Sequence, residues 1–269
     1  MNLSRLLKKY RFLIGVFYKR DSQVLLSLVP RYLWAVFICI IYRFIFQAAL
    51  SGKAVQIDHF SLPFPVFLIS GIASVRLLLF SLKIFDETLA DIRRALPVGE
   101  LLMTPTSLWE ITLAHVLWKG FLSLNELLAV LISSRILLHI PLTPFAHPVV
   151  IVSGILIVLS YAGMGMTVSA LSFFIKKIDP VFLILNQISA VFCGVFFPIT
   201  LFPKFLQIFV SFFPMTHALK VIRLSLAGAA FHNQIPAVMA LLTMTALFLA
   251  IGTISLHKSL NWARKNGKL

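Results

Sequence analysis

The chain has 269 residues, of which 59% are hydrophobic and only 12% are charged, and its formal net charge is +15. Soluble domains use about 45–50% apolar and about 25% charged residues, so this composition predicts an integral membrane protein. The cations flank apolar runs, and no basic polar segment alternates with aromatic residues. This placement excludes a nucleic-acid partner and favours contact with anionic membrane lipid.

Residues 1–27 predict a basic amphipathic helix that lies in the headgroup plane of the membrane. Apolar side chains recur at i, i+3, i+4 and i+7 from Leu3 to Phe17, while most lysines and arginines fall away from that face. A soluble helix packed on another subunit is the alternative. The apolar segment that follows directly disfavours this alternative.

Six apolar segments then approach the roughly 20 residues that a membrane crossing needs. They cover residues 28–50, 64–85, 110–133, 149–174, 181–199 and 237–256, the fifth being marginal. No repeat relates the two halves, so the sequence predicts one all-α domain over residues 28–269 with six transmembrane helices. Lysine and arginine are more numerous on the side of the N-terminal helix and the C-terminal tail, which predicts that both termini are cytoplasmic.

The connection between the second and third spans, residues 86–109, mixes acidic and basic side chains with partial helical spacing. Pro97 and Gly99 would end a helix there, and Pro105 precedes the next span. A short charged helix held between two membrane helices would suit docking on a cytoplasmic partner. A solvated connection is the alternative.

Charged residues inside the predicted spans are costly, so they point to function or to pairing. His115, Lys119 and Glu126 are spaced i, i+4 and i+11 and share one helix face. We expect this face to line a subunit interface or the substrate path and to pair with Arg76 or among its own members. Snorkelling charges or a structural pair within one subunit are the alternative. In the fourth span, small residues including Gly163 and Gly165 predict a helix-packing face.

The segment from Gly194 to Gly228 is apolar but is interrupted by Pro198, Pro203 and Pro214. The run 204–213 would rise only about 15 Å, half of a bilayer core about 30 Å thick. We therefore expect a re-entrant helical hairpin over residues 198–228, between spans five and six, at the external leaflet. Its cations, Lys204, Lys220 and Arg223, should lie near the outer surface. His217 and Arg223 are expected to meet polar substrate groups or to anchor the hairpin to lipid phosphates.

Signatures of catalysis are missing from the sequence. Gly52-Lys53 and Gly267-Lys268 are not followed by Ser or Thr, so neither forms a phosphate-binding loop, and no nucleophile–base motif or metal-ligand spacing occurs. A membrane-embedded enzyme of lipid or glycan metabolism would need such a constellation. A secondary transporter, the other alternative, would usually show broken helices in both halves.

Three motifs in register resemble ABC-2 type transporter permeases. Glu87, the run Glu100-Leu101-Leu102-Met103-Thr104-Pro105 and Glu110 resemble the family's E…(E)LLxTP…E pattern. The second signature, G-x-x-F-P…L-P…P-x-T/H…R, is matched by Gly194, Phe197, Pro198, Phe202-Pro203, Pro214, Thr216, His217 and Arg223. The basic ending 263–269 is similar to the family's usual tail. One departure is Pro97-Val98-Gly99 before the LLxTP run, which predicts a shorter or kinked coupling helix.

The resemblance implies a permease subunit of an ATP-driven exporter, with no catalytic residues, metal or cofactor of its own. ATP and Mg would bind two partner ATPase subunits, and a second permease copy or paralogue would complete the path in a bacterial cytoplasmic (inner) membrane. Among substrates, lipid-linked glycans or lipo-oligosaccharides are favoured, with hydrophobic drugs next. The expected coupling residues are Glu87, Asp91, Arg93, Arg94, Glu100, Thr104 and Pro105. The expected gate residues are Gly194, Phe197, Pro198, Pro203, Pro214, Thr216, His217 and Arg223, and the candidate path residues are Arg76, Lys119 and Glu126.

Overall fold

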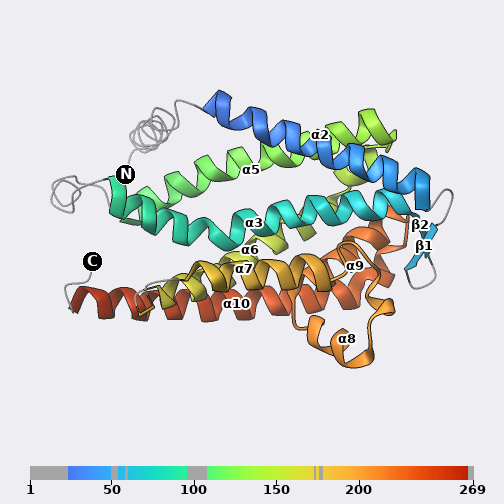
Figure 1. Ribbon diagram of the computed structural model, residues 1–269. Helices are drawn as coiled ribbons and strands as arrows, with labels where there is room; N and C mark the ends of the chain where they lie inside the picture. Colours follow the sequence, from blue (N-terminus) through green and yellow to red (C-terminus); the bar gives the residue numbers. More distant parts are fainter. Residues whose placement is uncertain are drawn as a thin grey trace.

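The computed structural model describes residues 24–49, 54–57, 60–95, 108–172, 174–175 and 178–265. Apart from one β-hairpin, the regular elements of these residues are helical (Figure 1). The predicted amphipathic helix, residues 1–27, lies outside the described residues except for 24–27, and so do the last residues of the tail, 266–269. The α-helices are α2 (Val24–Ala49), α3 (Phe64–Ala95), α5 (Leu108–Leu138), α6 (Pro148–Leu171), α7 (Asp179–Gln187), α8 (Lys204–Val210), α9 (Pro214–Leu226) and α10 (Phe231–Lys265).

Four of these helices are long and apolar enough to cross a membrane, and they match predicted spans two, three, four and six. The spanning segments are Phe64–Thr88, Leu113–Leu138, Pro148–Leu171 and Phe231–Ala263. The bent pair α8–α9 raises the count to five if it is one broken span. The first and fifth predicted spans correspond to shorter apolar segments, Tyr32–Ile41 and Asp179–Phe192, so a count of six stays a prediction.

The fifth predicted span, 181–199, is shorter in the structure because the chain bends after residue 192. A π-helix, Ile188–Phe192, follows α7, and Gly194 then adopts a left-handed φ of 87° that ends helical structure. Asp179–Phe192 would rise about 21 Å at 1.5 Å per residue, less than a bilayer core of about 30 Å. The bend delivers the chain directly to the proline-interrupted segment.

A feature that sequence analysis missed is the hairpin between α2 and α3. Strands β1 (Ala54–Ile57) and β2 (Phe60–Pro63) pair antiparallel, with Ala54 opposite Pro63 and Ile57 opposite Phe60. Two short 3-10 turns, Thr143–Ala146 and Ile199–Leu201, complete the non-α elements of the described residues.

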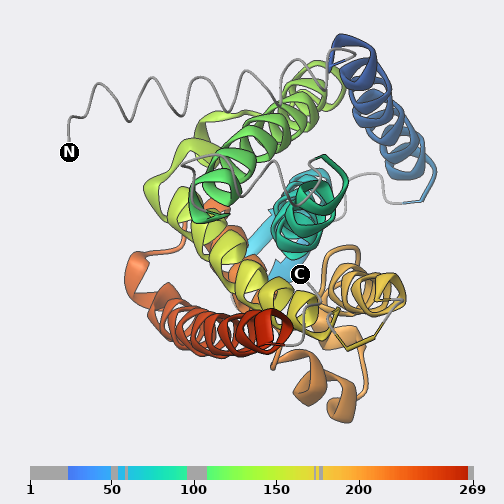
Figure 2. The same ribbon diagram turned by 90° about the vertical axis from the view of Figure 1, so that its left-hand side faces the viewer.

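The long helices run side by side, and α3 occupies the centre of the bundle. Viewed along the bundle, α2 and α5 lie on one side of α3, with α6, α7 and α10 on the other (Figure 2). The hairpin, α8 and α9 gather at one end, whereas the last turns of α3, the start of α5 and the end of α10 lie at the opposite end (Figure 1). We call these the hairpin end and the Ala95 end of the bundle.

Two apolar clusters hold the bundle together. The larger one joins α3, α6, α7 and α9 around Tyr161, Phe182 and Met215, all fully buried. The smaller one joins α2, α3 and α5 around Cys39 and Ile69. Outside these clusters, large apolar side chains such as Phe37, Phe121 and Met239 are exposed on α2, α5 and α10, as expected for helices that face lipid.

The small-residue face predicted in the fourth span is confirmed as a packing face. A Cβ built on Gly163 of α6 would lie 2.5 Å from the carbonyl carbon and oxygen of Phe248 in α10. Gly252 of α10 faces the Gly163 backbone in return, and Gly165 lies against the Leu82 carbonyl of α3. Only glycine lets these backbones approach so closely.

Candidate functional site

An arginine clasp joins the proline-interrupted segment to α3 at the hairpin end. Arg223 of α9 donates from Nη1 to the Gly194 carbonyl (2.7 Å) and from Nη2 to the carbonyls of Val195 (3.0 Å) and Phe67 (3.2 Å). Its Nε approaches Ser70 Oγ at 3.4 Å, and its guanidinium carbon lies 3.4 Å from the centre of the Phe67 ring. The planar fork of arginine suits this set of acceptors, which a lysine could not fill.

Local backbone geometry makes the clasp feasible. The positive φ of Gly194 turns the chain so that two successive carbonyls point to Arg223. Gly71 of α3 provides the room, because a Cβ there would lie 2.5 Å from the Val195 carbonyl oxygen. The bend after α7 is therefore packed directly against the backbone of α3.

Arg223 lies inside the protein, which disfavours the alternative in which it anchors the hairpin to lipid phosphates, and its predicted place near the outer side of the membrane stays a prediction. Its side chain is 5% exposed, and its donors are used by protein carbonyls rather than left for lipid phosphates. Burial of a cation requires such compensation, and the carbonyls of a broken segment supply it. Periodicity places Arg223 on the buried side of α9, but it does not reveal which carbonyls meet it. Lys204 and Lys220 are exposed, as expected.

The helices α8 and α9 meet at an angle of 93°, which agrees with a broken apolar segment. Pro203 precedes α8, and Pro214 is the first residue of α9, where its missing N–H costs nothing. At the bend, Thr216 Oγ1 donates to the Val210 carbonyl (2.7 Å) and His217 Nε2 to the Ser211 carbonyl (2.8 Å). The Val210 carbonyl also accepts from the Phe213 N–H (3.0 Å), so Thr216 adds a second donor there, while His217 supplies a donor to the Ser211 carbonyl just beyond α8.

Between α9 and the start of α10 lies a pocket with a volume of about 460 Å³. It brings together four of the predicted gate residues: Pro198, Thr216, His217 and Arg223. Phe197, which directly precedes Pro198 in the sequence, is exposed and does not line the pocket. Pro203 and Pro214 lie at the starts of α8 and α9 and do not line it either. The remaining lining residues are Phe67, Ile199, Thr200, Leu219, Lys220, Asn233, Pro236, Ala237 and Ala240. We call it the α9–α10 pocket.

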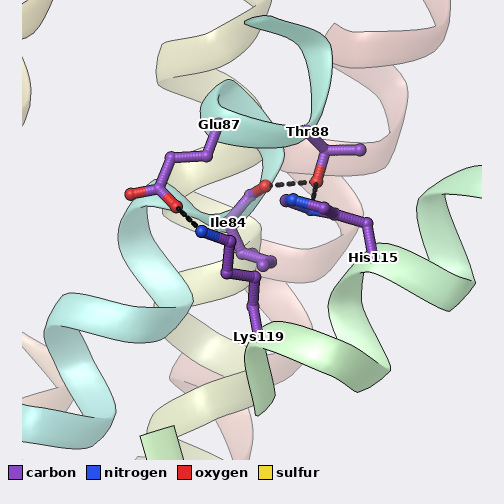
Figure 3. Close-up of polar contacts among 5 residues, drawn as sticks. All are labelled: Ile84, Glu87, Thr88, His115 and Lys119. Atoms are coloured by element: carbon purple, nitrogen blue, oxygen red, sulfur yellow. Dashed lines mark hydrogen bonds and ion pairs between the residues drawn. The ribbon is translucent and has the colours of Figure 1, made fainter. Parts of the chain in front are cut away.

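A second polar region, the charged cluster, lies between α3 and α5 toward the Ala95 end. Lys119 Nζ is 3.7 Å from Glu87 Oε2, and Arg76 Nη1 is 3.6 Å from Glu126 Oε2 (Figure 3 shows the first pair). The Arg76 guanidinium also lies 3.6 Å from the centre of the Trp34 ring in α2. These four charged residues line a cavity of about 280 Å³ together with Lys83.

Beside this cluster, a buried hydrogen bond ties His115 of α5 to Thr88 of α3. Thr88 Oγ1 lies 2.6 Å from the Ile84 carbonyl and 2.7 Å from His115 Nδ1 (Figure 3). A hydroxyl has one proton and a carbonyl can only accept, so Thr88 donates to Ile84. His115 Nδ1 therefore bears a proton and donates to Thr88.

The expectation that the charged face pairs with Arg76 is confirmed for Glu126, and the pair lies within one chain. Sequence reasoning missed the partner of Lys119, which is the expected coupling residue Glu87. The i, i+4, i+11 spacing shows which face of α5 is charged, but only the register between α3 and α5 decides the pairing. The expectation that this face lines a subunit interface or the substrate path stays a prediction.

The predicted coupling connection begins as helix. Residues 86–95 continue α3 without a break, and the described part of this helix extends to Ala95. Asp91, Arg93 and Arg94 belong to this helical extension, whereas Glu100, Thr104 and Pro105 lie outside the described residues. With 32 residues, α3 is about 48 Å long, well beyond a bilayer core of about 30 Å. Its last turns therefore reach past the membrane.

Within the described parts of the chain, no group of three histidine, cysteine, aspartate or glutamate side chains is arranged to hold a metal ion. The polar groups form ion pairs and bind carbonyls instead. An apolar multi-span bundle with a broken helix pair and a long central helix defines a multi-pass membrane protein whose architecture suits transport.

Comparison with family models then assigns the chain. The model of the ABC-2 type transporter matches residues 12–227, and the chain belongs to this family. It is therefore a membrane permease domain, a non-catalytic transmembrane subunit, and in this family ATP binding belongs to partner ATPases. A search of curated proteins found no match.

Proposed function

We propose that this permease exports an amphiphile across a bacterial cytoplasmic membrane, together with two ABC ATPase subunits and a second permease copy or paralogue. Resemblance to lipo-oligosaccharide exporters favours a lipid-linked glycan or lipo-oligosaccharide as substrate, with a hydrophobic drug next. ATP binding would close the ATPases and push on the connection between α3 and α5. The push would open or collapse a route at the hairpin end.

The observation that supports this coupling most is the position of Glu87 on α3. It pairs with Lys119 of α5, so the two helices that flank the 96–107 connection are joined close to it. Phe67 and Ser70, about 30 Å away on the same unbroken helix, hold Arg223. A displacement of the Ala95 end would therefore be transmitted along α3 to the clasp.

The proposed orientation rests on the distribution of cations between the two ends. Arg93 and Arg94 belong to the last turns of α3 and Lys258 and Lys265 to those of α10, all toward the Ala95 end (Figure 1). Fewer cations belong to α8 and α9 at the opposite end. The positive-inside rule then makes the Ala95 end cytoplasmic and the hairpin end external.

The test is the ATPase rate of the permease co-expressed with its ABC ATPase in proteoliposomes. We expect Glu87→Gln and Asp91→Asn to lower the permease-stimulated rate at least about fivefold, since each removes a charge from the coupling end. Asp179→Asn, an acid at the start of α7 and outside α3 and α5, is the matched control and should leave the rate unchanged.

Failure to stimulate any ABC ATPase would contradict the proposal. So would an equal loss of rate in the Asp179 control, because that result would reveal general damage rather than coupling. Substrate movement that persists with a hydrolysis-deficient ATPase would instead favour a secondary transporter.

A further inference from the structure

An apolar cavity with a volume of about 400 Å³ lies between α3, α5 and α6. Its floor is a buried face of α3 that includes Ala73 and Ser74, and its walls include Leu127 of α5 and Gly154 of α6. Both α5 and α6 pack against α3, but their backbones hardly approach each other, so a gap stays between them. We call this cavity the α5–α6 pocket.

The chemistry of the lining selects an apolar ligand. Ser70 and Ser74 are the only polar side chains among the described residues that line the pocket. Ser70 donates its hydroxyl proton to the Phe67 carbonyl (2.8 Å), and Ser74 donates its own to the Ser70 carbonyl (2.8 Å). Both donors are thus used within α3, and the other lining residues are apolar. A cavity lined in this way excludes water and accepts apolar molecules.

The mouth of the pocket opens on the lipid-facing surface of the bundle. Leu124 of α5 and Ile155 of α6 line the pocket and are exposed at the same time, so they form its rim. The lining residues of α3, α5 and α6 all fall within the candidate membrane spans of these helices. The medium at the mouth is therefore lipid hydrocarbon rather than water.

The dimensions of the pocket suit a single hydrocarbon chain. The lining runs 70–77 of α3 and 124–131 of α5 each rise about 10 Å at 1.5 Å per residue. An acyl chain that crosses one leaflet covers about 15 Å, half of a bilayer core, so the pocket takes much of its length. A helix is about 10–12 Å across with its side chains, so a segment 10 Å long needs about 800–1,100 Å³. A helix of a second copy can cover the mouth but cannot fill the cavity.

Packing supplies the affinity for such a chain. In the pocket it meets protein on three sides and gains dispersion contacts that fluid lipid at a single helix face does not provide. Gly154 leaves room for it, because a Cβ built there meets only the end of Leu77, at 3.3 Å. Ser70 belongs to both the pocket and the Arg223 clasp, so the chain lies directly behind the clasp.

We propose that the α5–α6 pocket binds one acyl chain of a resident membrane phospholipid. The chain fills the gap between α5 and α6 and supports both helices against α3. Its headgroup plays no part in recognition, since the lining offers no free donor. The inference goes beyond the proposed export function and does not depend on it, because this lipid is held rather than moved.

The first experiment titrates dioleoyl phosphatidylcholine and dioleoyl phosphatidylglycerol onto the full-length permease in detergent, and native mass spectrometry gives the bound fraction. Gly154→Leu places a side chain in the cavity. It should weaken retention of a phospholipid about fivefold, the effect of losing about ten carbon–carbon contacts. The loss should be the same for the two lipids, because no polar group of the lining distinguishes their headgroups.

Ala246→Leu is the matched control, because it adds the same side chain at an exposed position of α10 that does not line the pocket. Gly154→Met is a second test variant, whose flexible side chain fills an irregular gap with less strain. Equal retention by the wild type and both Gly154 variants would overturn the proposal. An equal loss in the Ala246 variant, or a loss confined to phosphatidylglycerol, would overturn it too.

The second experiment needs only the wild type, so it does not depend on how the variants fold. Phosphatidylcholine with a diazirine on its acyl chain is irradiated in proteoliposomes, and the adducts are mapped by peptide mass spectrometry. Adducts on Ala73 or Ser74 are expected, because both are buried and line the floor of the pocket. Adducts confined to exposed residues outside the pocket, such as Met239, would contradict the proposal.

Two further results would assign the pocket to another occupant and overturn the proposal. Disulfide cross-links between two copies of an Ile155→Cys variant, in place of adducts on the floor, would show that a second copy covers the pocket. Release of the labelled lipid on ATP hydrolysis by the assembled complex would show that the chain belongs to cargo. A resident lipid gives neither result.

Discussion

At the hairpin end of α3, Arg223 is held by three backbone carbonyls and a serine hydroxyl, whereas toward the Ala95 end Lys119 meets Glu87 across 3.7 Å. The arginine is 5% exposed, while the Lys119 and Glu87 side chains are 28% and 47% exposed. The backbone fixes the carbonyls that bind Arg223, so these hydrogen bonds can change only if α3, α9 or the bend at Gly194 moves. A partly exposed ion pair at 3.7 Å is weaker than a set of buried hydrogen bonds and exchanges partners more easily. We therefore expect the contacts at the hairpin end of α3 to stay unchanged and the ion pair toward the Ala95 end to rearrange.

The largest effect should follow from Arg223→Met, which removes the clasp. The carbonyls of Gly194 and Val195 would lose their donor, at about 1–3 kcal/mol for each group left unsatisfied, whereas the Phe67 carbonyl keeps the Ser70 hydroxyl as a donor. We expect a large loss of thermal stability in detergent and poor recovery of monodisperse protein. Arg135→Met, an exposed arginine in the last turn of α5, should be near neutral. Equal melting temperatures for the two variants would show that the clasp does not hold the broken segment.

A smaller but clear effect is expected from Gly163→Ala in the α6–α10 contact. The new Cβ would meet the Phe248 backbone at 2.5 Å, which a main chain cannot relieve by a rotamer change, so about 1–3 kcal/mol should be lost. Gly154→Ala in the same helix meets only the flexible end of Leu77 at 3.3 Å. That control should be neutral or slightly stabilising, because alanine favours helices. Measured unfolding midpoints in detergent compare the pair directly.

Next in size is Thr88→Val, which tests the hydrogen bond next to the charged cluster. Valine keeps the shape but leaves the buried His115 Nδ1–H without its acceptor, for a loss of about 1–2 kcal/mol. Thr253→Val removes an exposed hydroxyl that bonds only within α10. A Thr88 variant as stable as the Thr253 variant would contradict the donor assignment for His115.

The smallest stability change is expected for Glu87→Gln. Exposed ion pairs contribute about 0.2–1 kcal/mol, so a double-mutant cycle with Lys119→Gln should give a coupling energy in that range and a decrease at high salt. The same variant should nevertheless reduce ATPase stimulation strongly. A coupling energy of several kcal/mol would show that this contact is rigid and would remove the contrast between the two ends of α3.

Much of the fold could be predicted from local signals. Apolar runs located the four long spans, and prolines located the bent pair. The spacing of His115, Lys119 and Glu126 also predicted that they share one face of α5. These features depend on residues that are close in sequence, because local hydropathy and backbone chemistry determine where a helix lies.

The unpredicted features depend on residues far apart in sequence. Arg223 finds its acceptors in Phe67 and Ser70, about 150 residues earlier, and helical periodicity cannot specify such partners. Lys119 pairs with Glu87 because of the register between two helices, which no spacing rule fixes. Each strand of the β1–β2 hairpin has only four residues, so its sequence cannot be told from that of an ordinary loop.

The close contact of Gly163 with Gly252 has a consequence for biogenesis. The two residues are about 90 positions apart, so α6 leaves the ribosome well before its partner. At about 5–20 residues per second, the glycine face of α6 waits several seconds or longer for α10. During that interval its exposed backbone must be shielded by lipid or by the insertion machinery. Insertion of α10 is therefore the step that covers this face of α6, and a nascent chain stopped before α10 should be recognised by quality-control proteases.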